Sequence, residues 1–266
     1  SNHIKKQWVS YVETLQSIAN PPVDGLTLPS LGELGSIEEI SEAAGFADPE
    51  QTAATVSQEK NLHFFIHLGK VDGVADLVKS IKWKWNSKSD AKFTGMLKSA
   101  YSKLTKHVKD YIEAVQASGA INHVWSFGTD PAQYGVAMKK QSLAAQLYAE
   151  GLEMEEGTQT YRWLDDTSSG KWMSKKLLQC GEGDVLQNTD SMCASFQEHW
   201  GDSAHFGNHI RMRMRCLKGA KMTPSWGSGG FNSEGELTTL PGQRFVVLST
   251  KKGIPGNPDG VDMDVL

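Results

Sequence analysis

The sequence predicts an α+β protein, with a helical N-terminal region followed by a mainly β C-terminal part with connecting helices. Apolar residues recur at helical spacing in several segments of residues 1–150. After Gly151, short strand-like runs alternate with turns formed by Gly, Ser and Asn. The clearest run, residues 209–217, alternates apolar side chains with arginines, which is the period of a strand.

Three signals predict helices in the first 50 residues. Apolar side chains in residues 4–18 fall on one helical face. Ser36 and Glu39 have the spacing of a capping box, which marks the start of a helix. Asp48 followed by Pro49 places a capping residue before the first helical position, where proline is tolerated.

Two longer helices are expected next. The first starts after Asp90, carries apolar residues at helical spacing over 93–115, and closes at Gly119. The second starts at Asp130, before a proline, and runs to about Gly151.

Three segments after Gly151 are expected to be strands: 160–164 (TYRWL), 209–217 (HIRMRMRCL) and 243–249 (QRFVVLS). In 209–217 the alternation puts the arginines on one face and the apolar side chains on the other. That basic face is either solvated or meets phosphate or an acidic target.

Composition limits the function. A chain of 266 residues holds one large domain or two small ones, and its net charge of −4 argues against a protein that binds nucleic acid as a whole. The sequence has neither the apolar core of a signal peptide at its start nor a run of about 18 apolar residues that would span a membrane. Its three cysteines lack a CxxC pair, which argues against a disulfide framework and a zinc site. We therefore expect a soluble protein in a reducing cytoplasm, that of a host cell or of a bacterium.

Glu234 and Glu236 form a Glu-x-Glu pair behind the glycine-rich stretch 225–230 (SWGSGG) and before a strand. In an extended chain both carboxylates point to one face, so they repel each other. Such a pair on its own is most often a solvated edge. Its position behind a flexible loop also suits a catalytic pair.

The order Arg162, Ser195, Glu-x-Glu resembles that of mono-ADP-ribosyltransferases of the Arg–Ser–Glu class, which includes cholera-toxin-like toxins, bacterial effectors and phage-encoded enzymes. The resemblance covers roughly residues 128–266, with residues 1–127 as a separate helical region. The stretch 234–247 (EGELTTLPGQRFVV) carries it most specifically. It implies two packed sheets around an NAD cleft, with NAD as substrate and no metal.

The resemblance also implies roles for single residues. Glu236 stabilises the positive ribose that forms as nicotinamide leaves, Ser195 holds Glu236 by a hydrogen bond, and Arg162 binds the pyrophosphate. Trp163 stands where the family often has glycine, at the position that binds the nicotinamide amide. Phe196 belongs either to the core or to a platform for nicotinamide.

The acceptor is expected to be an arginine on a protein target. Guanidinium keeps its proton and is a poor nucleophile, so a second carboxylate, Glu234, would orient it and take the proton. The resemblance assigns the first Glu of the pair to arginine targets. Trp226 and Phe231 in the preceding loop would contact the target protein.

Two other functions stay open: an NAD glycohydrolase, in which water is the acceptor, and a structural or interaction protein, such as a phage or effector component. A metal site is not expected, because His205 and His209 lack a third ligand. Residues 79–109 hold nine lysines against one acid, Asp90. They form either a solvated face or a contact with an acidic partner, a membrane surface or nucleic acid.

Overall fold

The computed structural model describes 65–82, 91–106, 108–110, 112, 146–147, 149–164, 171–188, 193–196, 209–225, 235–240 and 243–266. Predictions for residues 4–18, 36–39, 48–49 and 130–131 lie outside these residues, as does the domain boundary between 127 and 128. The same holds for the C-terminal end of the long helix and for Glu234, Trp226, Phe231 and His205.

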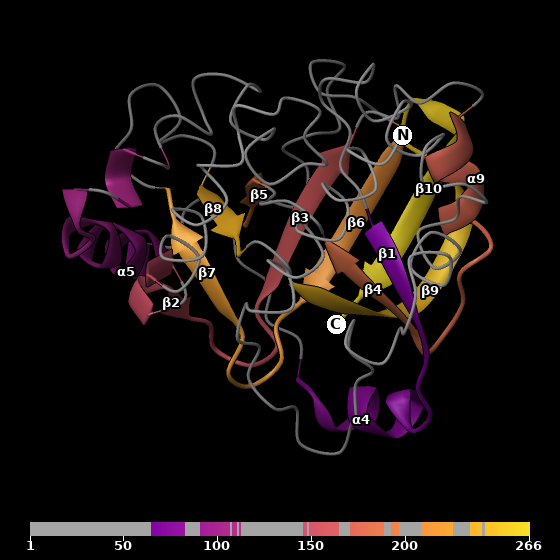
Figure 1. Cartoon of the computed structure of the whole chain (residues 1–266), viewed down its shortest axis with the longest axis horizontal. Coiled ribbons are helices and arrows are strands. Elements are labelled where there is room, and N and C mark those ends of the chain that lie inside the picture. The colour runs from indigo at the N-terminus through magenta and orange to yellow at the C-terminus, as the bar shows by residue number, and fades with distance from the viewer. Residues whose placement is uncertain are drawn as a thin grey trace, which may run out of the picture.

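The described strands form one continuous hydrogen-bonded array in the order β1-β4-β9-β10-β6-β3-β5-β8-β7-β2 (Figure 1). Their bounds are β1 Phe65–Lys70, β2 Leu152–Glu153, β3 Gln159–Leu164, β4 Asp184–Asn188, β5 Cys193–Ser195, β6 Ile210–Arg215, β7 Lys221–Pro224, β8 Glu236–Thr239, β9 Arg244–Ile254 and β10 Asn257–Val265.

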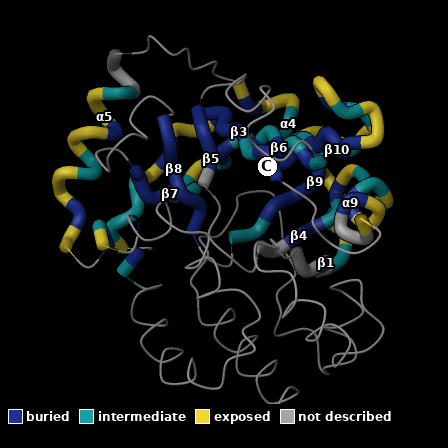
Figure 2. The backbone as a smooth tube through the Cα atoms, turned by 90° about the horizontal axis from the view of Figure 1, so that it is seen from above, coloured by how far each residue is buried: buried dark blue, intermediate teal, exposed yellow. Residues whose placement is uncertain are grey.

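The long strand β9 divides this array into two layers. Its first residues, 244–246, pair with β4, whereas residues 247–254 pair with β10. Figures 1 and 2 show β1 and β4 as a layer in front of β6 and β10. One apolar cluster joins the layers, with Leu186 and Phe245 on one side and Ile210 and Met212 on the other. The expected α+β fold with two packed sheets is confirmed.

Three helices are fully described: α4 Val74–Ser80, α5 Ala91–Ser102 and α9 Trp172–Leu177. The long helix expected over 93–115 is interrupted, because α5 ends at Ser102 and helical residues resume at Lys106. The carboxylate of Glu150 accepts hydrogen bonds from the backbone N–H of Thr105, at 3.0 Å, and from its hydroxyl, at 3.2 Å. Glu150 therefore binds Thr105 at the start of the second helical piece, directly after the break.

Residues 65–70 form a strand within the region that the sequence predicted to be helical. This strand, β1, pairs antiparallel with β4, with a register shift between His67 and Gly69. The prediction of helix was wrong here, because a short apolar run fits a buried strand as well as a helix. Pairing with β4, distant in sequence, decides between them.

The three strands expected after Gly151 are confirmed as β3, β6 and β9. The alternation in β6 appears in its burial, with Ile210, Met212 and Met214 buried and the arginines between them partly exposed. Among the helices of the described residues, none is long and apolar enough to cross a membrane.

The arginines at 211 and 213 on the basic face of β6 are partly exposed and form ion pairs within the chain. Strand β10 lies parallel to β6 and places Asp262 opposite Arg211 and Asp264 opposite Arg213. The Nη1 atom of Arg213 donates a hydrogen bond of 2.9 Å to Oδ1 of Asp264. Arg211 and Arg213 thus have acidic partners within the chain, which the sequence-based expectation of a solvated or ligand-binding face did not include.

Candidate functional site

Ser195 and Glu236 stand directly opposite each other in the antiparallel strands β5 and β8. Directly opposite residues project to the same face, with Cβ atoms roughly 5 Å apart. Both side chains are buried, with 5% of Ser195 and 6% of Glu236 exposed. The second carboxylate of the Glu-x-Glu pair is therefore not on a solvated edge, as an isolated pair would suggest.

A row of directly paired residues crosses five strands and contains this pair. It runs from Asp264 on β10 through Arg213 on β6 and Tyr161 on β3 to Ser195 and Glu236. Because each member is opposite the next, all five side chains lie on one face of the sheet. Of this row, Ser195 and Glu236 were predicted from the sequence as site residues, whereas Tyr161, Arg213 and Asp264 were not.

Arg162 is not on that face. It pairs with Met212, while its neighbour Tyr161 pairs with Arg213 and with Ser195. Since side chains alternate along a strand, Arg162 projects to the opposite face from Ser195 and Glu236. The structure thus places Ser195 and Glu236 on one face of the sheet and Arg162 on the opposite face.

Trp163 lies on the same face as Tyr161, opposite Arg211. The two aromatic rings have centroids 6.2 Å apart with an interplanar angle of 31°, within the range of favourable aromatic pairs. Only 7% of Trp163 is exposed. Its ring packs beside Tyr161, so the nicotinamide contact expected for Trp163 stays a prediction.

Phe196 follows Ser195 and is 1% exposed, among the largest fully buried side chains of the described residues. It belongs to the apolar cluster together with Ala194 and Leu237. A ring inside the core has no exposed face on which nicotinamide could stack. Of the two roles left open for Phe196, the structure favours the core.

The start of β8 is also fixed from its other side. The backbone N–H of Ser225, at the end of β7, donates a hydrogen bond of 3.3 Å to the carbonyl oxygen of Glu236. The hydroxyls of Ser225 and Thr238 lie 2.8 Å apart and are buried. Glu236 thus lies between paired strands on both sides, which is the setting of a preorganised carboxylate.

One arginine on the face that carries Glu236 has a lowered pKa. Burial lowers the pKa of Arg215 to about 10, with the charge of Arg213 lowering it further and Asp264 opposing the change. Arg215 remains protonated at neutral pH. It pairs with Gln159 across β3 and lies on the face that carries Glu236.

The cysteines and acidic groups offer no alternative centre among the described residues. Burial raises the pKa of the Cys216 thiol to about 12, which leaves it protonated and unreactive at neutral pH. The described Cys180 and Cys216 are free thiols. No group of His, Cys, Asp or Glu in the described ranges is arranged to hold a metal ion.

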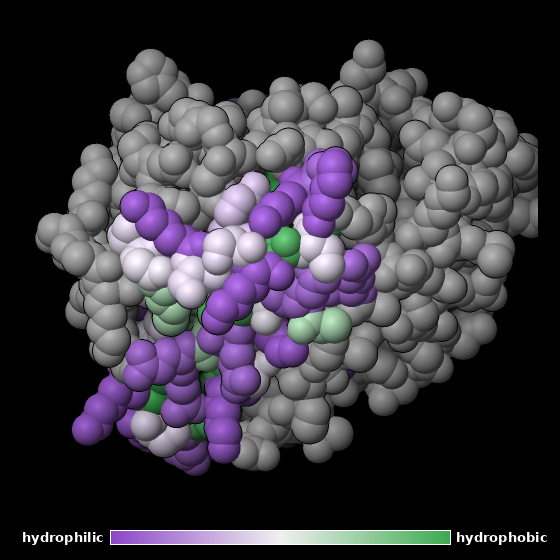
Figure 3. All heavy atoms as spheres, turned by 90° about the vertical axis from the view of Figure 1, so that its left-hand side faces the viewer, coloured by the Kyte–Doolittle hydropathy of each residue, from purple (hydrophilic) through white to green (hydrophobic). Residues whose placement is uncertain are grey.

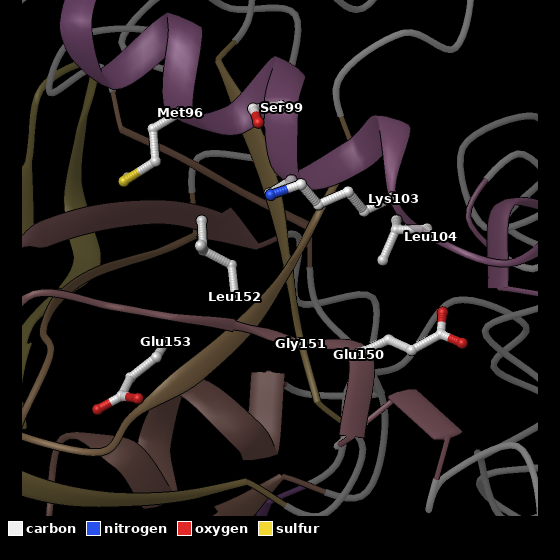
Figure 4. Close-up of a pocket in the computed structure, with 9 residues that line it drawn as sticks. Met96, Ser99, Lys103, Leu104, Glu150, Gly151, Leu152 and Glu153 are labelled. Atoms are coloured by element: carbon white, nitrogen blue, oxygen red, sulfur yellow. The ribbon is translucent and has the colours of Figure 1, made fainter.

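A cavity of about 400 Å³ lies elsewhere, between α5 and β2. Figure 4 shows Met96 of α5 and Lys103, which follows the end of α5, on one side and Leu152 of β2 on the other. The described surface on this side is mostly hydrophilic, with small apolar spots (Figure 3). None of its lining residues belongs to the row that contains Glu236, so we do not place the site there.

The described lysines of the stretch 79–109 do not form one patch. Its described residues lie on α4 and on α5 with the helical turn that follows, and Figures 1 and 2 both show α4 and α5 far apart. Lys79 pairs with Asp76 at 3.2 Å, and Lys106 with Asp110 at 2.6 Å. These observations favour solvated helix faces for the described lysines.

The architecture is the fold of bacterial mono-ADP-ribosyltransferase toxins. Three solved structures with this fold are the C3 exoenzyme of Clostridium limosum, an ADP-ribosyltransferase of Clostridium botulinum, and the enzymatic component of the C2 toxin, also of Clostridium botulinum.

The C3 exoenzyme is 12% identical, with 70% of this chain and 97% of that chain covered and a TM-score of 0.51. The botulinum ADP-ribosyltransferase is 13% identical, with 70% and 98% covered and a TM-score of 0.50. The C2 toxin component is 15% identical, with 69% and 49% covered and a TM-score of 0.50. Identities this low establish the fold alone. No family model matches the sequence, and none of the curated proteins does.

Proposed function

We propose that this chain is an NAD-dependent mono-ADP-ribosyltransferase that transfers ADP-ribose to an arginine of a protein target and releases nicotinamide. The observation that carries the proposal is the direct pairing of Ser195 with Glu236 inside this fold. The chain order of Arg162, Ser195 and Glu236, by which the sequence resembles these enzymes, supports it.

The chemistry assigns Glu236 to the bond that breaks. When the bond between the nicotinamide nitrogen and the ribose carbon breaks, its electron pair leaves with nicotinamide and positive charge grows on the ribose. A fixed carboxylate beside that sugar stabilises the charge, and it does so more strongly where water is excluded. Glu236 is 6% exposed and lies between paired strands, which suits this role.

Ser195 would orient Glu236. In the proposal its hydroxyl donates a hydrogen bond to the carboxylate of the residue directly opposite. This bond would hold one rotamer of Glu236 and keep the carboxylate charged, because a hydrogen bond to the charged form lowers the pKa of a carboxyl.

The pyrophosphate of NAD is proposed to bind Arg162, whose planar guanidinium can donate two parallel hydrogen bonds to phosphate oxygens. Because Arg162 projects to the opposite face from Glu236, it would contact a part of NAD distant from the bond that breaks. Trp163 is proposed to contact the nicotinamide end.

Glu234 is proposed to prepare the acceptor. It would orient the guanidinium of the target arginine and accept its proton as the nitrogen attacks the ribose carbon. Water needs no such residue once the ribose is positively charged. The two glutamates therefore have separable roles, and only Glu234 is specific to an arginine acceptor.

The direct test incubates the purified chain with labelled NAD and a cell lysate and maps the modified residue by mass spectrometry. We expect labelled protein, with ADP-ribose on arginine. Label on another residue type would remove the arginine assignment but leave the transferase. Nicotinamide release without labelled protein would identify a glycohydrolase. Absence of both products would contradict the proposal and favour a structural or interaction protein.

A further inference from the structure

Phe196 and Gly235 form the backbone contact that follows the Ser195–Glu236 pair. The N–H of Phe196 donates a hydrogen bond of 3.2 Å to the carbonyl oxygen of Gly235. Gly235 is the middle residue of Glu-x-Glu and has φ of +58°, in the left-handed region that favours glycine. The chain turns here and then enters β8 at Glu236.

The ring of Phe196 fills the space that a side chain at residue 235 would need. A Cβ atom built on Gly235 would lie 1.8 Å from Cε1 of Phe196, 2.3 Å from Cδ1 and 2.5 Å from Cζ. These separations are far below any van der Waals contact, so the ring covers the α-carbon of Gly235 directly. A glycine is required at this position for space as well as for backbone conformation.

The ring itself is anchored. Phe196 is 1% exposed and packs in the apolar cluster with Ala194 and Leu237, the two residues that pair on β5 and β8. Core side chains interdigitate at crystal-like density and do not shift freely. The packed ring therefore restricts the position of the turn at Gly235.

We propose that Phe196 is a positioning residue for Glu236, acting through Gly235. Its ring fixes the left-handed turn from which β8 starts and so sets the place of the Glu236 carboxylate opposite Ser195. Phe196 does not contact the substrate in this role. The inference rests on the proposed function for its catalytic consequence, whereas its geometric part can be tested without activity.

The first test is Gly235→Ala. The new methyl must displace the ring or the turn, so we expect kcat for nicotinamide release to fall about a hundredfold, as for a misplacement near 1 Å, with little change in KM for NAD. Adding Phe196→Val removes the three ring atoms nearest the methyl. In the double variant the alanine methyl takes the space of those ring atoms and supports the turn in place of the ring, so turnover should recover at least severalfold over Gly235→Ala alone.

Gly73→Ala is the matched control for backbone strain. Gly73 has φ of +81°, at the start of α4, and a Cβ there would meet nothing within 4 Å. It therefore carries the strain of a left-handed alanine without a ring to displace. We expect Gly73→Ala to keep wild-type turnover, so that a loss in Gly235→Ala reports the contact with Phe196.

A second readout is independent of activity. With ¹³C-labelled glutamate, the carboxyl resonance of Glu236 is assigned by its loss in Glu236→Gln, and its titration midpoint is measured in each variant. We expect the midpoint to move in Gly235→Ala and to return toward wild type in the double variant. Phe196→Leu replaces Phe196→Val if the latter does not fold.

The two claims can fail separately. A wild-type protein that releases no nicotinamide contradicts the proposed function, and the titration then decides the positioning claim alone. An unchanged Glu236 midpoint in Gly235→Ala overturns the inference whatever the activity. Wild-type turnover in Gly235→Ala, or no recovery in the double variant, overturns it while the proposed function stands.

Discussion

Arg211 on β6 and Asp262 on β10 face each other across parallel strands and form a two-point ion pair. The Nε and Nη2 atoms of Arg211 donate hydrogen bonds of 3.0 and 2.9 Å to the two carboxylate oxygens of Asp262. Their side chains are 14% and 5% exposed, and Lys251 approaches Asp262 at 3.3 Å. This pair fixes the register of β10 against β6, two strands that carry the row leading to Glu236.

Replacing Asp262 with asparagine should destabilise the fold. The substitution leaves the charge of Arg211 buried without its counter-ion, which costs about 3 kcal/mol for a buried pair. We expect the free energy of unfolding in urea, followed by tryptophan fluorescence, to fall by roughly that amount.

Asp259→Asn provides the control for this experiment. Asp259 lies on the same strand and pairs with Lys252 at 2.7 Å, but the two side chains are 80% and 61% exposed. Exposed pairs contribute little, so its unfolding curve should overlay that of the wild type. An equal decrease in the free energy of unfolding in the two variants would show that the Arg211–Asp262 pair stabilises the fold no more than an exposed pair does.

The same pair predicts a dependence of stability on pH. Although burial raises the pKa of Asp262, the hydrogen bonds and charges of Arg211 and Lys251 hold it below its ordinary value. A carboxyl with a depressed pKa in the folded state contributes stability that is complete above its unfolded pKa, about 4. That contribution is lost as pH falls through the folded pKa.

Urea unfolding at a series of pH values between 7 and 3 measures this effect. The wild type should lose stability below about pH 4, and Asp262→Asn should lose less over the same interval. Parallel curves for the two proteins would mean that Asp262 has the same pKa in both states.

Much of the β architecture could be predicted from the sequence, because period-two alternation is a local property. Strand β6 has this alternation, whereas β3 and β9 were predicted from short apolar runs bounded by turn residues. The neighbour of β6 in the sheet could not be predicted from the alternation in β6 alone. A second alternation, Asp262 and Asp264 in residues 261–265, complements the arginines of β6. Taken together, the two alternations could have predicted the ion pairs between β6 and β10.

Within the site, the sequence predicted residue types but not faces. Ser195 and Glu236 come together because β5 and β8 pair in a register that their local sequence does not determine. For the same reason Arg162 could not be placed, since a shift by one residue moves a side chain to the other face. The core role of Phe196 follows from its burial in a cluster with Leu237, a residue that only folding brings close to it.

Arg162→Lys tests the proposed pyrophosphate contact. Lysine keeps the charge but loses the planar fork, so we expect a smaller NAD-induced rise in melting temperature. Arg213→Lys is the matched change on the other face of the sheet, where Arg213 is paired with Asp264. Its NAD-induced rise should equal that of the wild type. An unchanged rise in Arg162→Lys together with a smaller rise in Arg213→Lys would place the phosphates of NAD on the face that carries Glu236.

Glu234→Gln should separate the two activities of the proposed enzyme. Transfer to protein should drop severely because guanidinium loses the group that orients and deprotonates it, while NAD hydrolysis continues with water as acceptor. Label on protein and nicotinamide release are measured side by side in the same variant. A joint loss would give Glu234 a role in NAD binding or structure, and no loss would point to an acceptor other than arginine.

The central claim is that the buried carboxylate of Glu236, opposite Ser195, drives cleavage of NAD. Its most direct test compares nicotinamide release by the wild type, Glu236→Gln and Glu153→Gln, the last being an exposed glutamate on β2. Gln keeps the size of Glu and removes its charge from a buried place, so the melting temperature should not fall. We predict release by the wild type and Glu153→Gln, and a loss on the order of a hundredfold in Glu236→Gln. Turnover near that of the wild type in Glu236→Gln would contradict the account.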